Sequence, residues 1–228
     1  MQFFRETDTV EPSMRTLLSL KFLSMIVLLL TPFEAAAQRK ADPGAFDYYI
    51  LSLSWSPAHC SRPDRDDDPD QCGAGKNHGF VVHGLWPQHE QGGYPRSCSA
   101  QRTVPKAVVD ETMAVMPSPS LMVQQWQKHG TCSGVDVVKY FATLRDAAAR
   151  VTIPDAVKTP KPDLSLPPEK LQSLFTEANP GLTPDMVAVI CARRQVTEVR
   201  VCLDKDLKFR ACGKGVADRC GKGTALKG

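Results

Sequence analysis

The chain has 228 residues, of which 42% are hydrophobic and 23% are charged, and its formal net charge is +3 at pH 7. This composition excludes an intrinsically disordered chain, and so small a charge does not by itself predict nucleic-acid binding. The length is sufficient for one domain with a sizeable hydrophobic core.

The N-terminus has the pattern of a secretory signal peptide. An apolar run, Phe22–Leu30, follows two basic residues and precedes the small-residue sequence EAAAQ. The run is short for a membrane-spanning helix, which needs ~20 residues. We therefore expect residues 1–37 to be a signal peptide cleaved near Ala37, with a retained membrane anchor as the alternative and Met14 as a second candidate start. These 37 residues hold more acidic than basic side chains, so the remaining chain is mildly basic, which suits a polyanionic substrate.

All eight cysteines lie beyond this segment. An even number of cysteines in an exported chain favours disulfides over a zinc site. No C-x-x-C pair occurs, so the usual zinc-ribbon spacing is absent. Spacing alone does not choose among the 105 possible pairings. The cysteines are Cys60, Cys72, Cys98, Cys132, Cys191, Cys202, Cys212 and Cys220.

The first part of the exported chain predicts two strands separated by a loop. Residues 45–57 alternate and are rich in aromatic and apolar side chains, which predicts a strand. The polar segment that follows reads as a surface loop that a Cys60–Cys72 bridge could close. Its acidic run, residues 64–70, lacks the glycine and closing glutamate of an EF-hand, so a solvated loop is favoured over a calcium site. Residues 80–83 predict a short strand that ends at His83.

Four helices are predicted next. Residues 104–116 have helical periodicity, with a proline suited to the first turn. A short helix, LMVQQWQKH, is expected to begin after Ser120 as its N-cap. Residues 134–151 and 168–178 are the third and fourth predicted helices.

Three valine-rich runs close the chain. MVAVICA, TEVRVCLD and LKFRACG read as strands of an antiparallel meander. Helices and strands are mixed without regular βαβ alternation, and no internal repeat is present. We therefore predict one α+β domain, in which a central antiparallel sheet carries helices and disulfides staple the chain.

Two of the five histidines lie in distinctive settings. His83 stands in HGLWP and His129 in KHGTC, each at the predicted end of a regular element and each before a glycine that lets a backbone or ligand approach closely. Gln125, Lys128 and His129 can share one helix face. The dipole at a helix C-terminus would favour protonated His129. Two histidines and a lysine are the groups that in-line phosphodiester cleavage needs, to move two protons and to stabilise charge on phosphate oxygens.

Ordinary roles compete with this reading. A single histidine is more often a hydrogen-bonded structural residue, and Trp86 and Trp126 are more often core residues than ligand-stacking ones. A zinc site made of His83, His129 and a cysteine is also conceivable, although export and the even number of cysteines argue against it.

Two segments together resemble the active-site segments of the ribonuclease T2 family. They are HGLWPQ, residues 83–88, and QWQKHGTC, residues 125–132. Residues 46–60 and 187–204 resemble the family's first and late strands, so the resemblance extends over residues 45–220. It implies a ribonuclease T2-like domain over residues 38–228: a secreted or periplasmic endoribonuclease, monomeric, without metal or cofactor, that cleaves single-stranded RNA with low base specificity.

The resemblance also implies a role for each matching residue. His129 is the general base on the ribose 2′-OH, His83 is the general acid for the leaving 5′-oxygen, and Lys128 stabilises the pentacovalent transition state. The first product is then a 2′,3′-cyclic phosphate. Trp86, Gln88 and Tyr94 match positions that hold the base upstream of the cut.

The same resemblance implies the disulfide pairing. The expected bridges are Cys60–Cys72, Cys98–Cys132, Cys191–Cys220 and Cys202–Cys212. The second bridge would tie the end of the catalytic helix to the loop after HGLWP.

The second segment departs from the family pattern, which usually begins His-Glu-Trp. Gln124 stands at the auxiliary histidine position, which contributes to substrate binding, and Gln125 at the glutamate position, which belongs to the catalytic set. An amide can donate to a phosphate oxygen but brings no charge to tune a histidine. We expect an active enzyme, slower and with a displaced pH optimum. The alternative is a weakened or inactive RNA- or protein-binding member of the same fold.

Overall fold

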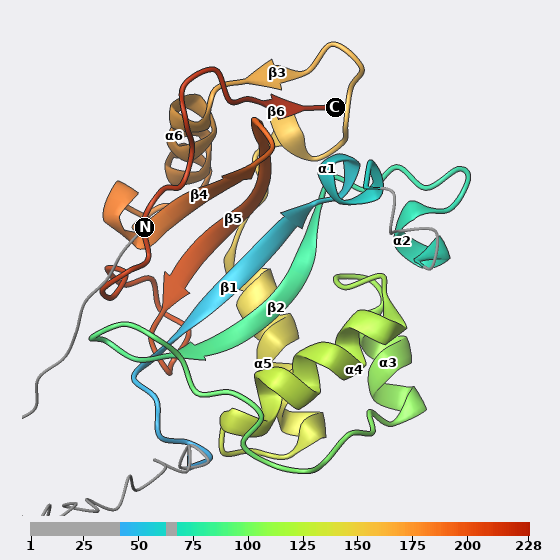
Figure 1. The fold of residues 1–228 in the computed structure, drawn as a ribbon, viewed down its shortest axis with the longest axis vertical. Coiled ribbons are helices and arrows are strands. Elements are labelled where there is room, and N and C mark those ends of the chain that lie inside the picture. Colours follow the sequence, from blue (N-terminus) through green and yellow to red (C-terminus); the bar gives the residue numbers. More distant parts are fainter. Residues whose placement is uncertain (1–41, 63–67) are drawn as a thin grey trace, which may run out of the picture. The chain divides into compact units, whose positions relative to one another are not determined.

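A four-stranded antiparallel sheet organises the protein, seen here in a computed structural model that describes residues 42–62 and 68–228 (Figure 1). The order across the sheet is β2-β1-β5-β4. A two-stranded sheet pairs β3 with β6. The strands are β1 Tyr48–Trp55, β2 Phe80–Gln88, β3 Ser165–Leu166, β4 Val187–Ala192, β5 Gln195–Leu203 and β6 Leu226–Lys227.

Helices cover one face of the sheet. Helix α5 packs on β1 and β2, α4 lies against β2, and α6 lies against β4 (Figure 1). None of the helices in the described ranges has the length and apolar character needed to cross a membrane. The helices are α1 Ser56–Cys60, α2 Pro69–Cys72, α3 Lys106–Thr112, α4 Pro119–Lys128, α5 Val137–Arg150 and α6 Pro168–Ala178, with 3₁₀ turns η1 Gly130–Cys132, η2 Asp155–Val157 and η3 Pro184–Met186.

The two faces of the sheet differ in chemistry because side chains alternate along each strand. On β1, Leu51, Leu53 and Trp55 enter the main hydrophobic core under the helices. The opposite face begins with a small apolar cluster around Ile50. It continues with buried polar side chains, among them Ser52. The polar face is therefore the part of the sheet that offers chemical groups.

A β-bulge lies at His83. Ser52 pairs with Gly84 and the next residue, Leu53, pairs with Val82, so His83 is the extra residue of β2. A bulge re-aims the side chain of the extra residue and is common beside active sites. The expectation that the strand ends at His83 is therefore wrong, because β2 continues through HGLWPQ to Gln88.

Most predicted elements are present, with three corrections. The N-cap of α4 is Ser118, whose hydroxyl accepts a hydrogen bond from the Leu121 amide, and not Ser120, because Pro119 opens the helix. Helix α3 spans only Lys106–Thr112 of the predicted residues 104–116, and Pro105 remains extended as its N-cap residue. The run LKFRACG makes only one isolated bridge, Leu203 with Phe209, and is not a strand. The acidic run, residues 64–70, lies partly outside the described residues. The expected signal peptide, residues 1–37, lies wholly outside them.

The four disulfides join the pairs that the family resemblance implies. They are Cys60–Cys72, Cys98–Cys132, Cys191–Cys220 and Cys202–Cys212. Cys98–Cys132 ties the segment after β2 to η1, which directly follows α4. Since no cysteine in the described ranges is free, a zinc site with a cysteine ligand is contradicted.

Candidate active site

His83 meets a carboxylate that comes from β5. Its Nδ1 lies 3.1 Å from Oε1 of Glu198, and its side chain is 36% exposed. The two residues are 115 positions apart in the sequence. Because β1 lies between β2 and β5, the bulge at His83 and the polar side of β5 meet over the polar face of the sheet.

Glu198 is held ionised by its neighbours. The hydroxyl of Ser52 donates to Oε1, and the guanidinium of Arg200 donates to Oε2 from Nε at 3.1 Å and from Nη2 at 2.7 Å. Burial alone would raise the pKa of Glu198, but the hydrogen bond and charge of His83, with Arg200 and Ser52, lower it to about 2. The carboxylate therefore holds His83 by Nδ1 and leaves the other ring nitrogen for a ligand.

Helix α4 delivers Lys128 and His129. Trp126 and Met122 bury one side of the helix in the core, which fixes its rotation. Lys128 is the last helical residue and is exposed, and His129 is the C-cap residue. The next residue, Gly130, packs against Trp126, where a side chain would overlap the ring. The glycine after His129 therefore serves close packing of the protein itself.

His129 is buried, in contrast to His83. It is 2% exposed, and its Nδ1 has no hydrogen-bond partner among the described residues. Burial, reinforced by the positive charges of Lys128 and His83, lowers its pKa to about 3. The expectation that the helix dipole favours protonated His129 is therefore wrong, since desolvation and a neighbouring cation outweigh a terminal dipole.

The indole of Trp86 contacts both histidines. Its ring centroid lies 5.2 Å from that of His83, edge to face, and 5.2 Å from that of His129, stacked. Its Nε1 donates to Oε1 of Gln125 at 2.7 Å. Of the two tryptophans, Trp86 thus belongs to the site, whereas Trp126 is a core residue.

Gly84 makes this contact possible. A Cβ on Gly84 would overlap both Oε1 of Gln125 and the indole nitrogen of Trp86. The glycine in HGLWP therefore allows a side chain of α4 to approach the backbone of β2.

Two pockets adjoin this group of residues, and Lys128 lines both. The smaller, of about 400 Å³, is lined by His83, Glu198, Gln124 and Gln125 among others. The larger, of about 610 Å³, includes His129 in its lining. The remaining expected binding residues, Trp86, Gln88 and Tyr94, also line the larger pocket.

The loop after β2 brings Tyr94 to the site. The Ser97 amide donates to the carbonyl of Lys128 at 2.9 Å, and the neighbouring Cys98–Cys132 disulfide fastens the same loop to η1. The Tyr94 ring lies 5.4 Å from that of His129 and 5.8 Å from Nζ of Lys128, and is 40% exposed. An aromatic face is thus available at the mouth of the larger pocket.

The structure gathers every expected site residue around these two pockets, and it adds three that the sequence analysis missed. Ser52, Glu198 and Arg200 lie on neighbouring strands with their side chains on the polar face. The signal was present as the alternation of polar and apolar residues in TEVRVCLD. Alternation shows that Glu198 and Arg200 share a face, but not that His83 lies opposite them.

Comparison with known proteins identifies the family. The Ribonuclease T2 family model matches residues 46–212. A ribonuclease of Aeromonas hydrophila is 46% identical over 116 residues, which cover 50% of this chain and 51% of that protein. A probable ribonuclease of Haemophilus influenzae is 32% identical over 179 residues, covering 73% of this chain and 61% of that protein. This chain belongs to the ribonuclease T2 family.

A solved structure shares the fold. The RNase-related protein from Calystegia sepium superposes with a TM-score of 0.63 at 23% identity, covering 80% of this chain and 96% of that one. The matches to the two bacterial relatives span only about half and about three fifths of their lengths.

Proposed function

We propose that the protein is a metal-independent endoribonuclease that cleaves single-stranded RNA by transphosphorylation, through a 2′,3′-cyclic phosphate. The observation that carries this proposal is that two histidines in contrasting environments both contact Trp86, while Lys128 lines both adjoining pockets. One proton acceptor, one proton donor and one cation are the minimum for an internal attack by a ribose hydroxyl.

His129 is the proposed general base. A pKa lowered to about 3 keeps its imidazole neutral, so it can accept the proton of the 2′-OH. The bound phosphodiester is an anion, and beside Lys128 it offsets the positive charge that disfavours protonation of His129. The ring thus becomes more basic when substrate is present.

His83 is the proposed general acid. The ionised Glu198 carboxylate, 3.1 Å from Nδ1, supplies a counter-charge for the imidazolium and fixes the ring. The proton on Nε2 passes to the 5′-oxygen as the bond from phosphorus to that oxygen breaks. In a ring-opening second step the roles reverse, and water yields a 3′-phosphate.

Lys128 and Gln125 are the proposed groups that stabilise charge on the non-bridging oxygens. Lys128 is exposed at the end of α4 and lines both pockets. Oε1 of Gln125 is occupied by the indole N–H of Trp86, so its amide N–H₂ is left to donate. Gln125 can therefore serve the phosphate where a glutamate, once ionised, would repel it. Gln124, exposed and lining the smaller pocket, is proposed to contact substrate there.

Base tolerance is proposed from the character of the larger pocket. Tyr94, which is 40% exposed, presents an aromatic face on which any base can stack. Trp86 lines the same pocket, with its ring already stacked on His129 and in contact with the Arg200 guanidinium. Gln88 donates its amide to the carbonyl of Pro87 at 3.0 Å, which leaves one amide oxygen to accept a hydrogen bond from a base. Stacking with few polar contacts gives weak discrimination among bases.

Export is proposed with this activity. Four disulfides fit an oxidising compartment, and residues 1–37 are proposed as the signal peptide that directs the chain to the periplasm or the exterior. The domain, residues 38–228, is proposed to act as a monomer without a cofactor.

The loss of the family's glutamate and auxiliary histidine at Gln124 and Gln125 favours one competing candidate, a binding protein without activity. A dinucleotide, ApU, separates the two. We expect cleavage to adenosine 2′,3′-cyclic phosphate and uridine, undiminished by a chelator, and no cleavage of the 2′-deoxy analogue. An intact ApU after prolonged incubation would favour the binding protein, and chelator-sensitive cleavage would contradict the metal-independent mechanism.

A further inference from the structure

The larger pocket carries more positive charge than one phosphate requires. Four permanent cations line it, and no carboxylate is among the described residues of its lining. The smaller pocket has Lys128 and Arg62 but also Glu198. The cations of the larger pocket are Lys128, Arg200, Lys214 and Arg219.

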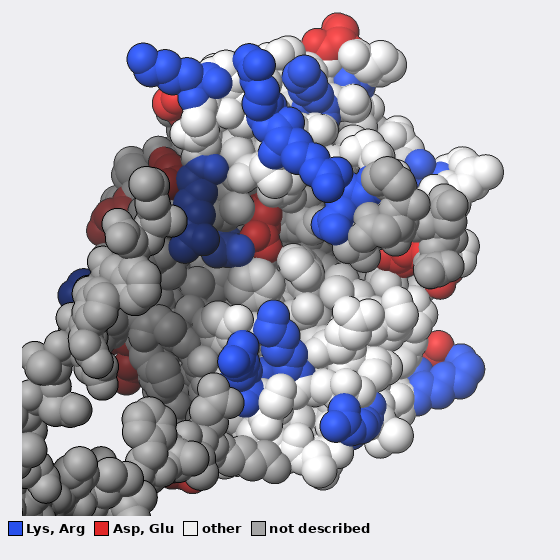
Figure 2. All heavy atoms as spheres, in the orientation of Figure 1, with Lys and Arg blue, Asp and Glu red and all other residues white. Residues whose placement is uncertain are grey.

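Two of these cations have no role in the proposed reaction. Lys128 serves the scissile phosphate, and Arg200 is paired with Glu198. Lys214 and Arg219 are exposed and have no carboxylate partner within the described part of the chain. The only side-chain hydrogen bond described for Arg219 goes from Nη2 to the carbonyl of Gly215, at 3.3 Å. Basic side chains also predominate over acidic ones on the face that Figure 2 shows.

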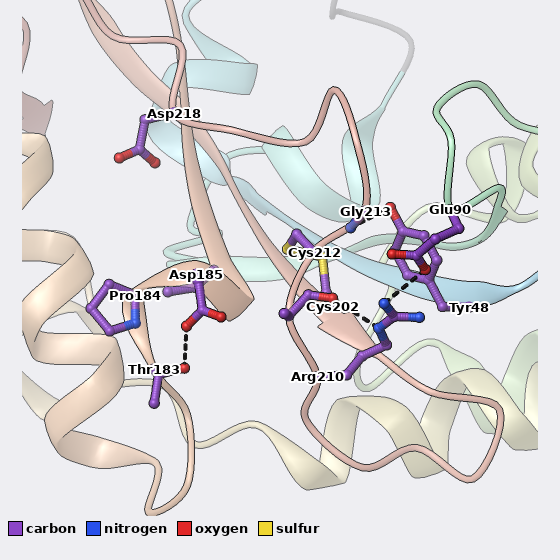
Figure 3. The surroundings of a disulfide bond; sticks show 12 residues. Tyr48, Glu90, Thr183, Pro184, Asp185, Cys202, Arg210, Cys212, Gly213 and Asp218 are labelled. Carbon is purple, nitrogen blue, oxygen red and sulfur yellow. Dashed lines mark hydrogen bonds and ion pairs between the residues drawn. A yellow bond between two sulfur atoms is a disulfide. The ribbon is translucent and has the colours of Figure 1, made fainter.

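The wall that carries Lys214 is fixed in place. The Cys202–Cys212 disulfide fastens this segment to β5 (Figure 3). The amide of Gly213 donates to the hydroxyl of Tyr48 at 3.2 Å, and the amide of Lys214 donates to the carbonyl of Glu90 at 2.9 Å.

A second pair of contacts ties the same wall to the loop after β2. The guanidinium of Arg210 forms an ion pair with Glu90 at 2.8 Å and lies over the Tyr48 ring (Figure 3). This ion pair offsets the negative charge of Glu90, which directly precedes Gln91 in the pocket lining. Anchoring of this kind lowers the entropy lost when a ligand binds.

The wall that carries Arg219 is fixed by β4. The Arg219 amide donates to the carbonyl of Val189 at 2.9 Å, and its carbonyl accepts from the amide of Cys191 at 3.2 Å. The adjacent residue, Cys220, is bonded to Cys191. Both cations therefore project from anchored backbone.

We propose that Lys214 and Arg219 form a subsite for the phosphate on the 5′ side of the upstream nucleotide, one phosphate before the one that is cut. This inference rests on the proposed function, because the direction of the chain follows from the proton transfers. His129 takes the proton of the upstream ribose and lines the larger pocket, so the upstream nucleotide lies there. His83 protonates the downstream oxygen and lines the smaller one.

The subsite defines the substrate more narrowly. A nucleotide with a 5′-phosphate or with further RNA on its 5′ side engages these cations, whereas a 5′-hydroxyl terminus does not. The enzyme then favours internal phosphodiester bonds over the first bond of a chain that begins with a 5′-hydroxyl. The positive charges of Lys214 and Arg219 would thus produce a preference for endonucleolytic cleavage.

Binding of uncleavable ligands tests the subsite without relying on activity. The 2′-deoxy dinucleotide dApdU lacks the nucleophile, and it is titrated in three forms: unmodified, with a 5′-phosphate and with a 3′-phosphate. We expect the 5′-phosphate to tighten binding by roughly 3- to 10-fold at low salt, and the gain to shrink as salt is added. No gain, or an equal or larger gain from the 3′-phosphate, would overturn the proposal.

Variants assign the effect to these two residues. The ratio to compare is the dissociation constant of unmodified dApdU divided by that of 5′-phosphorylated dApdU. In the double variant Lys214→Ala with Arg219→Ala, this ratio should fall toward one. Lys139→Ala, an exposed cation on α5 outside both pockets, is the matched control and should keep the wild-type ratio. A wild-type ratio in the double variant would overturn the assignment.

Binding of dApdU and cleavage of ApU, measured together, separate this proposal from the proposed function. If the protein cleaves no RNA but still prefers the 5′-phosphate, only the proposed activity fails. If it cleaves ApU but binds dApdU equally well with and without the 5′-phosphate, only the subsite fails.

Discussion

His83 and His129 are the same side chain in two contrasting environments. His83 lies on a bulge of a sheet strand, partly exposed, with an ionised carboxylate on Nδ1. His129 ends a helix, is 2% exposed, and has a lysine as its sequence neighbour and no hydrogen-bond partner on Nδ1 among the described residues. A carboxylate stabilises an imidazolium, whereas burial beside a cation stabilises neutral imidazole. The fold therefore gives the two rings different surroundings, and the proposed roles of proton donor and proton acceptor rest on this difference.

Removal of either ring should have the largest effect. We expect His83→Ala and His129→Ala each to lower kcat/KM for RNA by about 10²–10⁴-fold, since each removes one proton transfer. The comparison is sharpened by a uridine 3′-phosphodiester with a 4-nitrophenol leaving group, which departs without a proton. Most of the loss in His83→Ala should then disappear, while the loss in His129→Ala remains. Recovery of His129→Ala instead would show that the two roles are reversed.

Replacement of the carboxylate should have an intermediate effect. Glu198→Gln keeps the shape but not the charge that faces His83, so we expect kcat/KM for RNA to fall by roughly 10- to 100-fold. Breaking a buried pair with Arg200 also destabilises the fold, by about 3–5 kcal/mol. Activity is therefore measured below the unfolding transition of the variant.

The leaving-group comparison distinguishes positioning from general damage. If Glu198 acts through His83, the deficit of Glu198→Gln should shrink with the 4-nitrophenyl substrate, as for His83→Ala. Ser52→Ala removes one donor to the same carboxylate but leaves its charge, and is expected to cost less than about tenfold. A Glu198→Gln deficit that is equal for both substrates would contradict the positioning role.

The smallest expected effect is on the acid side of the pH profile. With a pKa lowered to about 3, His129 in the free enzyme stays a base well below pH 6.5, so kcat/KM should change less than about threefold between pH 6.5 and pH 5. An acidic limb with its midpoint near 6.5 would show that His129 titrates like an exposed imidazole.

The burial of His129 should also make the thermal stability of the protein depend on pH. Between pH 6.5 and about 3, unfolded His129 binds a proton that the native ring does not, so the melting temperature should fall as the pH is lowered through this window. Glu198, with its pKa lowered to about 2, adds a further loss below about pH 4.5, because unfolding then lets it take up a proton. His129→Asn should flatten the upper part of this dependence and leave the lower part in place.

The sequence by itself determined the α+β class, the elements with strong periodicity and the residues capable of the chemistry. Helix α6 runs over the predicted residues 168–178 because its pattern is local and Pro168 starts it. The motifs around His83 and His129 could also be recognised from the sequence, because each places its residues within a few positions.

Only the tertiary structure decided what surrounds these residues. The bulge at His83, the carboxylate of Glu198 and the wall of Lys214 all depend on contacts between distant segments, and no periodicity records which strands become neighbours. The low pKa of His129 depends on burial by several elements, which overrode the local influence of its helix end. Local patterns specify which groups are available, while desolvation and long-range pairing specify their charge and orientation.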